Sequence, residues 1–318
     1  MRKAFILLVL FILSISYAQE TRTVTDDLGR TVEVPVNPQR IISTADLTIS
    51  MALADFGVPF VGSAARLRPD GSLFLRHTET IYGVTLAGDG IVPVVTGGQF
   101  DFEAMVALEP DLILAIDRQV EFEDQFETMA PVYFIAEVPT PFAVQESIAR
   151  ALGLEAEFEE RRALYEAEVA ALREALDIPE GTTWSLLTPF EDRIRVANGN
   201  FNFTQVLDDL GLVPNELTQE QIDRGVVWSE WYSVEALERM DADIVFMHYS
   251  TPAGFPPNTL IERMDAVLPN WCDFITACAE GNVLLIPGSS INAPTFDSLN
   301  ATLDVVGSHL SSRMIGRQ

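Results

Sequence analysis

Two segments of this chain share almost the same residue pattern, and this repeat constrains the fold more than any other feature. One starts at Glu103 and reads Glu-Ala-Met-Val-Ala-Leu-Glu-Pro-Asp-Leu-Ile-Leu, and the other starts at Glu235 and reads Glu-Ala-Leu-Glu-Arg-Met-Asp-Ala-Asp-Ile-Val-Phe. Each glutamate follows a candidate helix cap, Asp101 or Ser233, and precedes helical turns, an acidic break and an apolar run typical of a buried strand. A helix-then-strand unit that occurs twice predicts two similar lobes with a cleft between them.

The rest of the chain fits this arrangement. Apolar and polar residues alternate from Val24 to Val34 around a polar turn, which predicts a β-hairpin. With 318 residues, 48% of them hydrophobic, the chain is long enough for two cores. Short apolar runs alternate with helical patterns on both sides of a segment rich in Glu, Ala, Leu and Arg, which predicts one long helix interrupted at Gly153. We therefore expect an α/β fold of two Rossmann-like lobes with parallel sheets, residues 19–141 and 179–318, joined by a rigid connecting helix over 142–178.

The start of the chain has the pattern of an export signal. Met1-Arg2-Lys3 precedes an apolar run from Ala4 to Leu13, and small residues follow up to Ala18, so we predict a signal peptide over residues 1–18. No cysteine stands at the cleavage point to accept a lipid, and we expect a soluble, monomeric periplasmic protein. The two cysteines, Cys272 and Cys278, form either a small disulfide loop or buried free thiols, and the oxidising compartment favours the bond.

The charge excludes some partners. The formal net charge is −27, which makes nucleic acids and anionic membranes poor partners and indicates a solvated acidic surface suited to a salty habitat. Lys3 is the sole lysine, so every positive side chain after the predicted signal peptide is an arginine.

Several motifs together resemble a known family. The segment Asp27-x-Gly29-x-x-Val32-x-Val34-Pro35-x-x-Pro38-x-Arg40-Ile41-Ile42, the Glu103 segment, the long helix and the Glu235 segment follow one another as in class III periplasmic substrate-binding proteins, over about residues 23–310. The resemblance implies a receptor that carries an iron-siderophore, haem or cobalamin to an inner-membrane ABC permease, with little closure on binding. It also implies that Glu103 and Glu235 pair with arginines of the permease. An acid in a first helical turn that only complements the helix dipole is the structural alternative for each glutamate.

Ligands of such sheets bind beyond the carboxyl ends of the strands, which selects candidate contacts. Arg66 and Arg118 follow strand candidates of the first lobe, and a guanidinium suits an anionic chelate, although pairing with a nearby acid is an equal alternative. Trp228 and Tyr249 are the aromatic candidates of the second lobe. Arg193 and Arg195 alternate with apolar residues, so we expect them on the solvated face of an edge strand, outside the site.

Other functions have less support in the sequence. The three histidines, His77, His248 and His309, are far apart in the sequence, so we expect no metal site and no intrinsic cofactor. His248 or Tyr249 would be the axial ligand in a haem receptor. An enzyme of chelatase-like fold is the alternative of another class, but the sequence has no nucleophile elbow, zinc-protease motif or P-loop. We therefore predict a receptor for a ferric siderophore.

Overall fold

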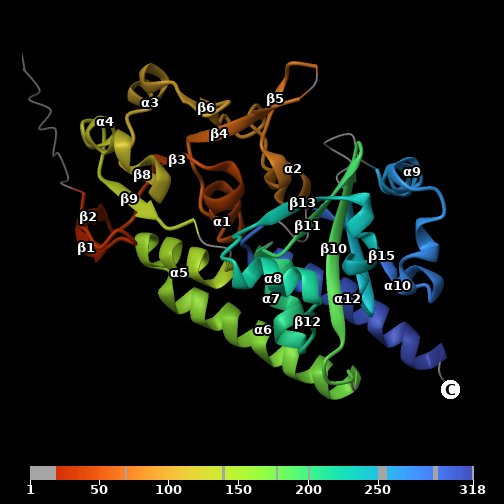
Figure 1. Ribbon diagram of the computed structural model, residues 1–318. Coiled ribbons are helices and arrows are strands. Elements are labelled where there is room, and N and C mark those ends of the chain that lie inside the picture. The colour runs from red at the N-terminus through yellow and green to blue at the C-terminus, as the bar shows by residue number, and fades with distance from the viewer. Residues whose placement is uncertain are drawn as a thin grey trace, which may run out of the picture.

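Figure 1 shows a computed structural model of the chain, which describes residues 19–68, 70–137, 140–176, 178–199, 201–249, 256–288 and 293–316. The predicted signal peptide, residues 1–18, lies outside the described residues. No helix within these ranges is long and apolar enough to span a membrane.

The first lobe is built on a 7-stranded sheet with the order β7-β6-β4-β3-β8-β9 and with β5 paired to β4. The hairpin of β1 and β2, predicted from its alternating pattern, packs beside it. The strands are β1 (Thr21–Thr25), β2 (Thr31–Pro35), β3 (Ile41–Ser43), β4 (Gly62–Leu67), β5 (Leu73–Phe74), β6 (Val92–Thr96), β7 (Gln99–Phe100), β8 (Leu112–Ile116) and β9 (Val132–Ile135). The helices are η1 (Asp46–Ser50), α1 (Met51–Asp55), α2 (Arg76–Tyr82), α3 (Phe102–Ala107), η2 (Asp117–Phe122) and α4 (Glu123–Glu127).

The second lobe has a 6-stranded sheet with the order β13-β11-β10-β14-β15, and β12 pairs with β10. Its strands are β10 (Thr183–Phe190), β11 (Arg193–Ala197), β12 (Val213–Pro214), β13 (Ser229–Ser233), β14 (Ile244–Tyr249) and β15 (Val283–Pro287). Its helices are α7 (Phe201–Leu210), α8 (Glu216–Asp223), η3 (Val234–Met240), α9 (Pro257–Val267), η5 (Trp271–Asp273), α10 (Thr276–Ala279) and α12 (Phe296–Gly316). The α/β class with two lobes is confirmed, but both sheets are mixed, because β5, β7 and β11 run antiparallel to their neighbours.

The connecting segment is two helices rather than the single helix predicted. α5 (Pro141–Leu152) ends at Gly153, which has a left-handed φ of 76°, and α6 (Glu155–Leu176) then starts in a new direction. α5 packs beside the first lobe, and α6 runs along the base of the molecule to pack on α7 and α12 of the second lobe (Figure 1). A single cluster of buried apolar side chains runs from the first lobe through α5 and α6 into the second lobe.

The repeated segments have equivalent places in the two lobes. α3 leads into β8 in the first lobe, and η3 leads into β14 in the second. The aspartate at each acidic break binds the start of the neighbouring strand. Asp111 accepts the backbone N–H of Arg40 at 2.8 Å, and Asp243 accepts the backbone N–H of Thr183 at 2.7 Å. The caps differ. Asp101 accepts the N–H of Ala104 at 2.9 Å as predicted, whereas the side chain of Ser233 does not cap η3.

Candidate ligand-binding site

A cavity of about 390 Å³ lies at the carboxyl ends of the first lobe's parallel strands. Both arginines that the strand-end rule selects in this lobe, Arg66 and Arg118, line it. Its lining consists of Thr44, Ala45, Asp46, Leu47, Thr48, Ala64, Ala65, Arg66, Arg76, Val95, Gly97, Gly98, Phe100, Arg118, Gln119, Glu121, Phe122 and Glu137. Arginines and carboxylates are equal in number there, although acids outnumber basic residues 47 to 20 in the whole chain.

Asp46 fixes one side of this cavity. Its buried carboxylate accepts two hydrogen bonds from Arg76, from Nε and Nη2, each at 2.7 Å. The Nε atom of Arg66 lies 3.6 Å from the same carboxylate, too far for a hydrogen bond. Asp46 therefore forms hydrogen bonds with Arg76 and only a longer ion pair with Arg66. The N–H groups of the Arg66 guanidinium can still donate to a ligand anion. Sequence reasoning missed Arg76, because it lies at the start of a helix after the short strand β5 and not after a predicted strand.

Arg118 also lines the cavity. Its Nη1 atom is 3.3 Å from a carboxylate oxygen of Glu137, and the other oxygen of Glu137 accepts the hydroxyl hydrogen of Thr48 at 3.2 Å. The Arg118 side chain is 67% exposed. An ion pair so exposed is worth about 0–1 kcal/mol, so a ligand anion can replace Glu137 as the partner of Arg118 at low cost.

In the second lobe, Thr188 of β10, Arg195 of β11 and His248 of β14 lie within contact of one another, and none of them lines the 390 Å³ cavity. Nδ1 of His248 is 3.3 Å from the Thr188 hydroxyl, and its Nε2 is 3.5 Å from Nη2 of Arg195. The pKa of His248 is lowered to about 4, mainly by burial and then by the charges of Arg195 and His77. His77 belongs to α2 of the first lobe.

The expectation that Arg195 lies on the solvated face of an edge strand is wrong. β11 lies between β10 and β13 and is not an edge strand, and Arg195 is half-buried. Burial lowers the pKa of its guanidinium, its Nε is buried without a hydrogen-bond partner, and no carboxylate of the described ranges forms an ion pair with it. Arg193, in contrast, is exposed as predicted. Because a buried charge needs a partner, the site has a place for an anion.

Comparison with known proteins agrees with this geometry. Residues 78–288 match the family model described as periplasmic binding protein. This chain is a periplasmic binding protein. It is similar to the probable siderophore-binding lipoprotein YfiY of Bacillus subtilis, with 26% identity over 72% of this chain and 69% of that protein. The family consists of transport receptors and not enzymes.

Solved structures show the same fold. Staphylococcus aureus SirA complexed with staphyloferrin B has a TM-score of 0.73 at 21% identity, covering 92% of this chain and 99% of SirA. The FhuD protein from S. pseudintermedius has a TM-score of 0.67 at 15% identity, covering 92% of this chain and 98% of that chain. The petrobactin-binding protein YclQ from B. subtilis has a TM-score of 0.66 at 17% identity, covering 92% and 99%.

The aromatic candidates of this periplasmic binding protein lie in different places. Tyr249 ends β14 and packs against the core cluster on the sheet face opposite His248, since neighbouring residues of a strand alternate. Trp228 is 36% exposed and precedes β13, and its carbonyl accepts the N–H of Asn198 at 3.0 Å. Trp231 pairs directly with Arg195 across β11 and β13, so its exposed ring shares the face of Arg195. Neither Trp228 nor Tyr249 lines the 390 Å³ cavity.

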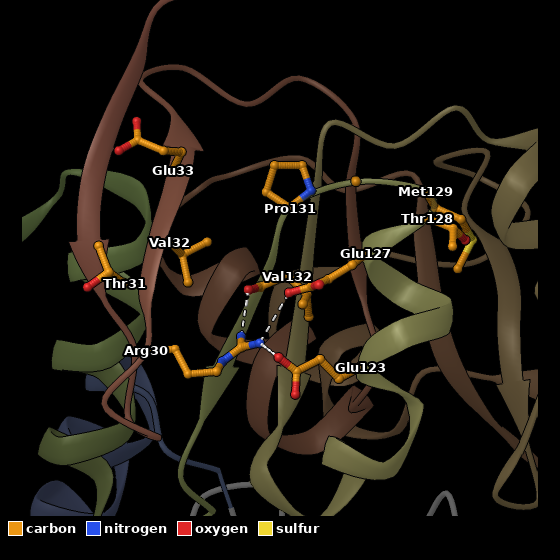
Figure 2. A pocket seen from close by; sticks show the side chains of 11 residues that line it. Arg30, Thr31, Val32, Glu33, Glu123, Glu127, Thr128, Met129, Pro131 and Val132 are labelled. Atoms are coloured by element: carbon orange, nitrogen blue, oxygen red, sulfur yellow. Dashed lines mark hydrogen bonds and ion pairs between the residues drawn. The ribbon is translucent and has the colours of Figure 1, made fainter.

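Figure 2 shows a larger hollow of about 620 Å³ between the β1–β2 hairpin and α4. It lies beyond the edge strand β9, on the far side of the first lobe from the second lobe (Figure 1). The guanidinium of Arg30 donates two hydrogen bonds to Asp26 and one each to Glu123, Glu127 and the carbonyl of Val132, so all five of its N–H groups are used. The smaller cavity at the strand ends is therefore the better candidate site.

The remaining predicted residues lie outside the cavity. Glu103 is in the first turn of α3 and Glu235 in the first turn of η3, and both are exposed. The hydroxyl of Ser233 lowers the pKa of Glu235. Cys272 and Cys278 form a disulfide with their Cα atoms 5.1 Å apart. In the described part of the chain, no group of three or more His, Cys, Asp or Glu side chains is arranged to hold a metal ion.

Proposed function

We propose that this protein captures an anionic ferric siderophore between its lobes and delivers it to an ABC permease of the inner membrane. The observation that carries the proposal is Arg195 of the second lobe, a half-buried cation without an acidic partner in the described ranges. The first lobe adds Arg66, Arg76 and Arg118 around its cavity. Guanidinium groups on both lobes suit a chelate with carboxylate or catecholate oxygens. The siderophore-binding relatives support the same class of ligand.

Glu103 and Glu235 provide the proposed contacts to the permease. Within each repeated segment the aspartate is used by the fold, since Asp111 and Asp243 hold the neighbouring strand. The glutamates are exposed and form no ion pair with any described residue, so the fold itself gives no reason for their repetition. Arginines of a permease would bind Glu103 and Glu235 through charge-assisted hydrogen bonds.

Export as a soluble protein is also part of the proposal. The basic start, the apolar run and the small residues before Gln19 support cleavage at that point, and the first cysteine is Cys272. The similar protein YfiY is a lipoprotein, whereas the segment before Gln19 of this chain contains no cysteine. The intact mass of the protein purified from the periplasm tests this part of the proposal.

Titration of the purified protein with iron chelates tests capture. Tryptophan fluorescence should be quenched by ferric staphyloferrin B or by a ferric catecholate, more strongly than by a neutral ferric trishydroxamate, cobalamin or haem. Arg195→Gln should weaken the preferred chelate about 10-fold to 100-fold, the loss expected for hydrogen bonds to a charged group, and Arg118→Gln only about 2-fold to 5-fold because that side chain is exposed.

Arg162→Gln is the matched control, since Arg162 lies on α6 and pairs with Glu166 away from the cleft. Equal affinity of the wild type and of Arg195→Gln for every anionic chelate would contradict the proposed site. Tighter binding of cobalamin or haem would contradict the proposed ligand.

A further inference from the structure

A groove of about 650 Å³ adjoins Glu103 on the outer side of β6 and β7. We call it the docking groove. Its lining is mostly apolar, it includes two acids, and it contains no basic residue. The lining consists of Leu73, Pro93, Val94, Thr96, Gln99, Phe100, Asp101, Phe102 and Glu103.

Two exposed apolar side chains extend the docking groove. Leu67 pairs directly with Leu73 across β4 and β5, so both side chains share one face, and Leu67 is 63% exposed. Val106 follows Glu103 by three residues on α3, which places both on one side of the helix, and it is 58% exposed. Exposed apolar side chains around a groove are typical of an interaction surface.

The negative charge of the docking groove comes from the carboxylates of Asp101 and Glu103. Asp101 also caps α3, because it accepts the N–H of Ala104. Glu103 has no ion-pair partner among the residues described. The groove is therefore complementary to a cation that carries apolar neighbours.

We propose that the docking groove binds a permease segment in which an arginine or lysine is flanked by apolar side chains, with the cation on Glu103 and the apolar side chains against Leu73 and Phe102. This inference rests on the proposed function and deepens it, because it adds an apolar contact to the glutamate contact. The negative charge of the chain favours a cationic protein segment over a membrane surface, because this acidic chain would be repelled by anionic lipids.

The docking groove also shares a wall with the ligand cavity. The ring of Phe100 lines both hollows, and it packs on Phe122 of the cavity, 4.7 Å between ring centroids, and on Phe102 of the groove, 5.6 Å between centroids. A permease segment seated in the groove thus lies one side chain away from the captured chelate.

Iron uptake by cells in which each variant is the sole receptor tests the proposal. Leu73→Asp and Val106→Asp each place a second negative charge in an apolar contact, so uptake of the ⁵⁵Fe chelate bound by the purified protein should fall about 10-fold. The affinity of the purified variants for the chelate should stay within about 2-fold of the wild type. Leu28→Asp is the control, because Leu28 is a similarly exposed leucine in the distant β1–β2 turn.

Crosslinking identifies the occupant directly. A photoreactive phenylalanine analogue at position 106 should give an adduct with a membrane-embedded permease subunit, whereas the analogue at position 28 should give none. Normal uptake by both groove variants would overturn the proposal, as would an adduct with a second copy of this chain. If the wild type binds no iron chelate at all, the proposed function itself fails, whatever the groove does.

Discussion

At the scale of single residues, Arg195 distinguishes this site from a solvated surface. A guanidinium keeps its charge even when burial lowers its pKa, because its ordinary pKa is far above neutrality. His248 beside it is different, since burial and the charge of Arg195 keep its imidazole neutral at pH 7. This part of the second lobe therefore carries one permanent positive charge, on Arg195, and one neutral imidazole, that of His248.

The two histidines of the cleft predict how stability depends on pH. The pKa values of His77 and His248 are both lowered to about 4 in the folded protein, mainly by burial, from 6.5 in the unfolded chain. Between pH 4 and pH 6.5 the unfolded chain binds more protons than the folded protein does. The free energy of unfolding is therefore unaffected by these histidines above pH 6.5, and it falls as the pH drops from 6.5 toward 4. Each histidine contributes a slope of at most about 1.4 kcal/mol per pH unit.

Urea unfolding from pH 4.5 to 7.5 measures this slope. The double variant His77→Gln, His248→Gln should lose part of the wild-type pH dependence below pH 6.5, and comparison with the wild type cancels the many carboxylates that titrate in the same range. Identical slopes for the two proteins would show that neither histidine is neutral and buried in solution.

At the scale of elements, Gly153 determines the direction of the connecting segment. Its φ of 76° is left-handed, and a Cβ there would meet only the guanidinium of Arg22, at 3.5 Å, which is an ordinary contact. Gly153→Ala should therefore lower the free energy of unfolding by about 1–2 kcal/mol through backbone strain alone.

Gly153→Asn is the matched variant, because asparagine tolerates the left-handed conformation better than alanine does. The free energy of unfolding of Gly153→Asn, measured in urea, should lie about halfway between those of the wild type and Gly153→Ala. If steric overlap were the cause, the larger asparagine would be less stable than alanine. Equal stability of wild type and Gly153→Ala would indicate that α5 and α6 merge into one helix in solution.

The sequence predicted individual helices and strands better than it predicted which strands lie side by side. Local patterns found the β1–β2 hairpin, the buried strand Leu112–Ile116 and the strand ends that carry Arg66 and Arg118. Arg195 was misplaced because β13, which covers the outer side of β11, is a partly exposed and polar strand with no buried apolar pattern. Which strands lie side by side is decided by packing of the whole sheet and not by the residues of one strand.

At the scale of the whole molecule, the lobes are joined by more than the connecting helices. Asp55 at the end of α1 in the first lobe accepts the N–H of Phe296 at the start of α12 in the second lobe, at 2.9 Å. The same buried carboxylate accepts the hydroxyl hydrogen of Tyr82 at 2.8 Å and lies 3.6 Å from Arg161 of α6. Together with the shared core, this contact favours a small hinge motion.

Removal of the Asp55 carboxylate tests how firmly the lobes are joined. Asp55→Ala leaves the N–H of Phe296 and the hydroxyl of Tyr82 without this acceptor, while Arg161 keeps the backbone carbonyl of residue 55, so the free energy of unfolding should fall by about 2–5 kcal/mol. Asp55→Asn keeps an oxygen for Phe296 and should lose about 1–2 kcal/mol. Hydrogen exchange at the start of α12 should rise most in Asp55→Ala, and unchanged exchange there would contradict a role in joining the lobes.

A rigid pair of lobes also fixes the separation of Glu103 and Glu235, and this predicts how they act together. If each glutamate binds one arginine of the permease, the double variant Glu103→Arg, Glu235→Arg should abolish ⁵⁵Fe uptake, while each single variant retains part of it because one contact remains. The control is Glu160→Arg with Glu174→Arg, two exposed glutamates of α6 whose reversal changes the net charge equally. The affinity of the purified double variant for the chelate should stay near that of the wild type, since neither glutamate lines the cavity. A large loss of affinity would instead place the glutamates in the cleft or the fold, and full uptake would remove them from the docking surface.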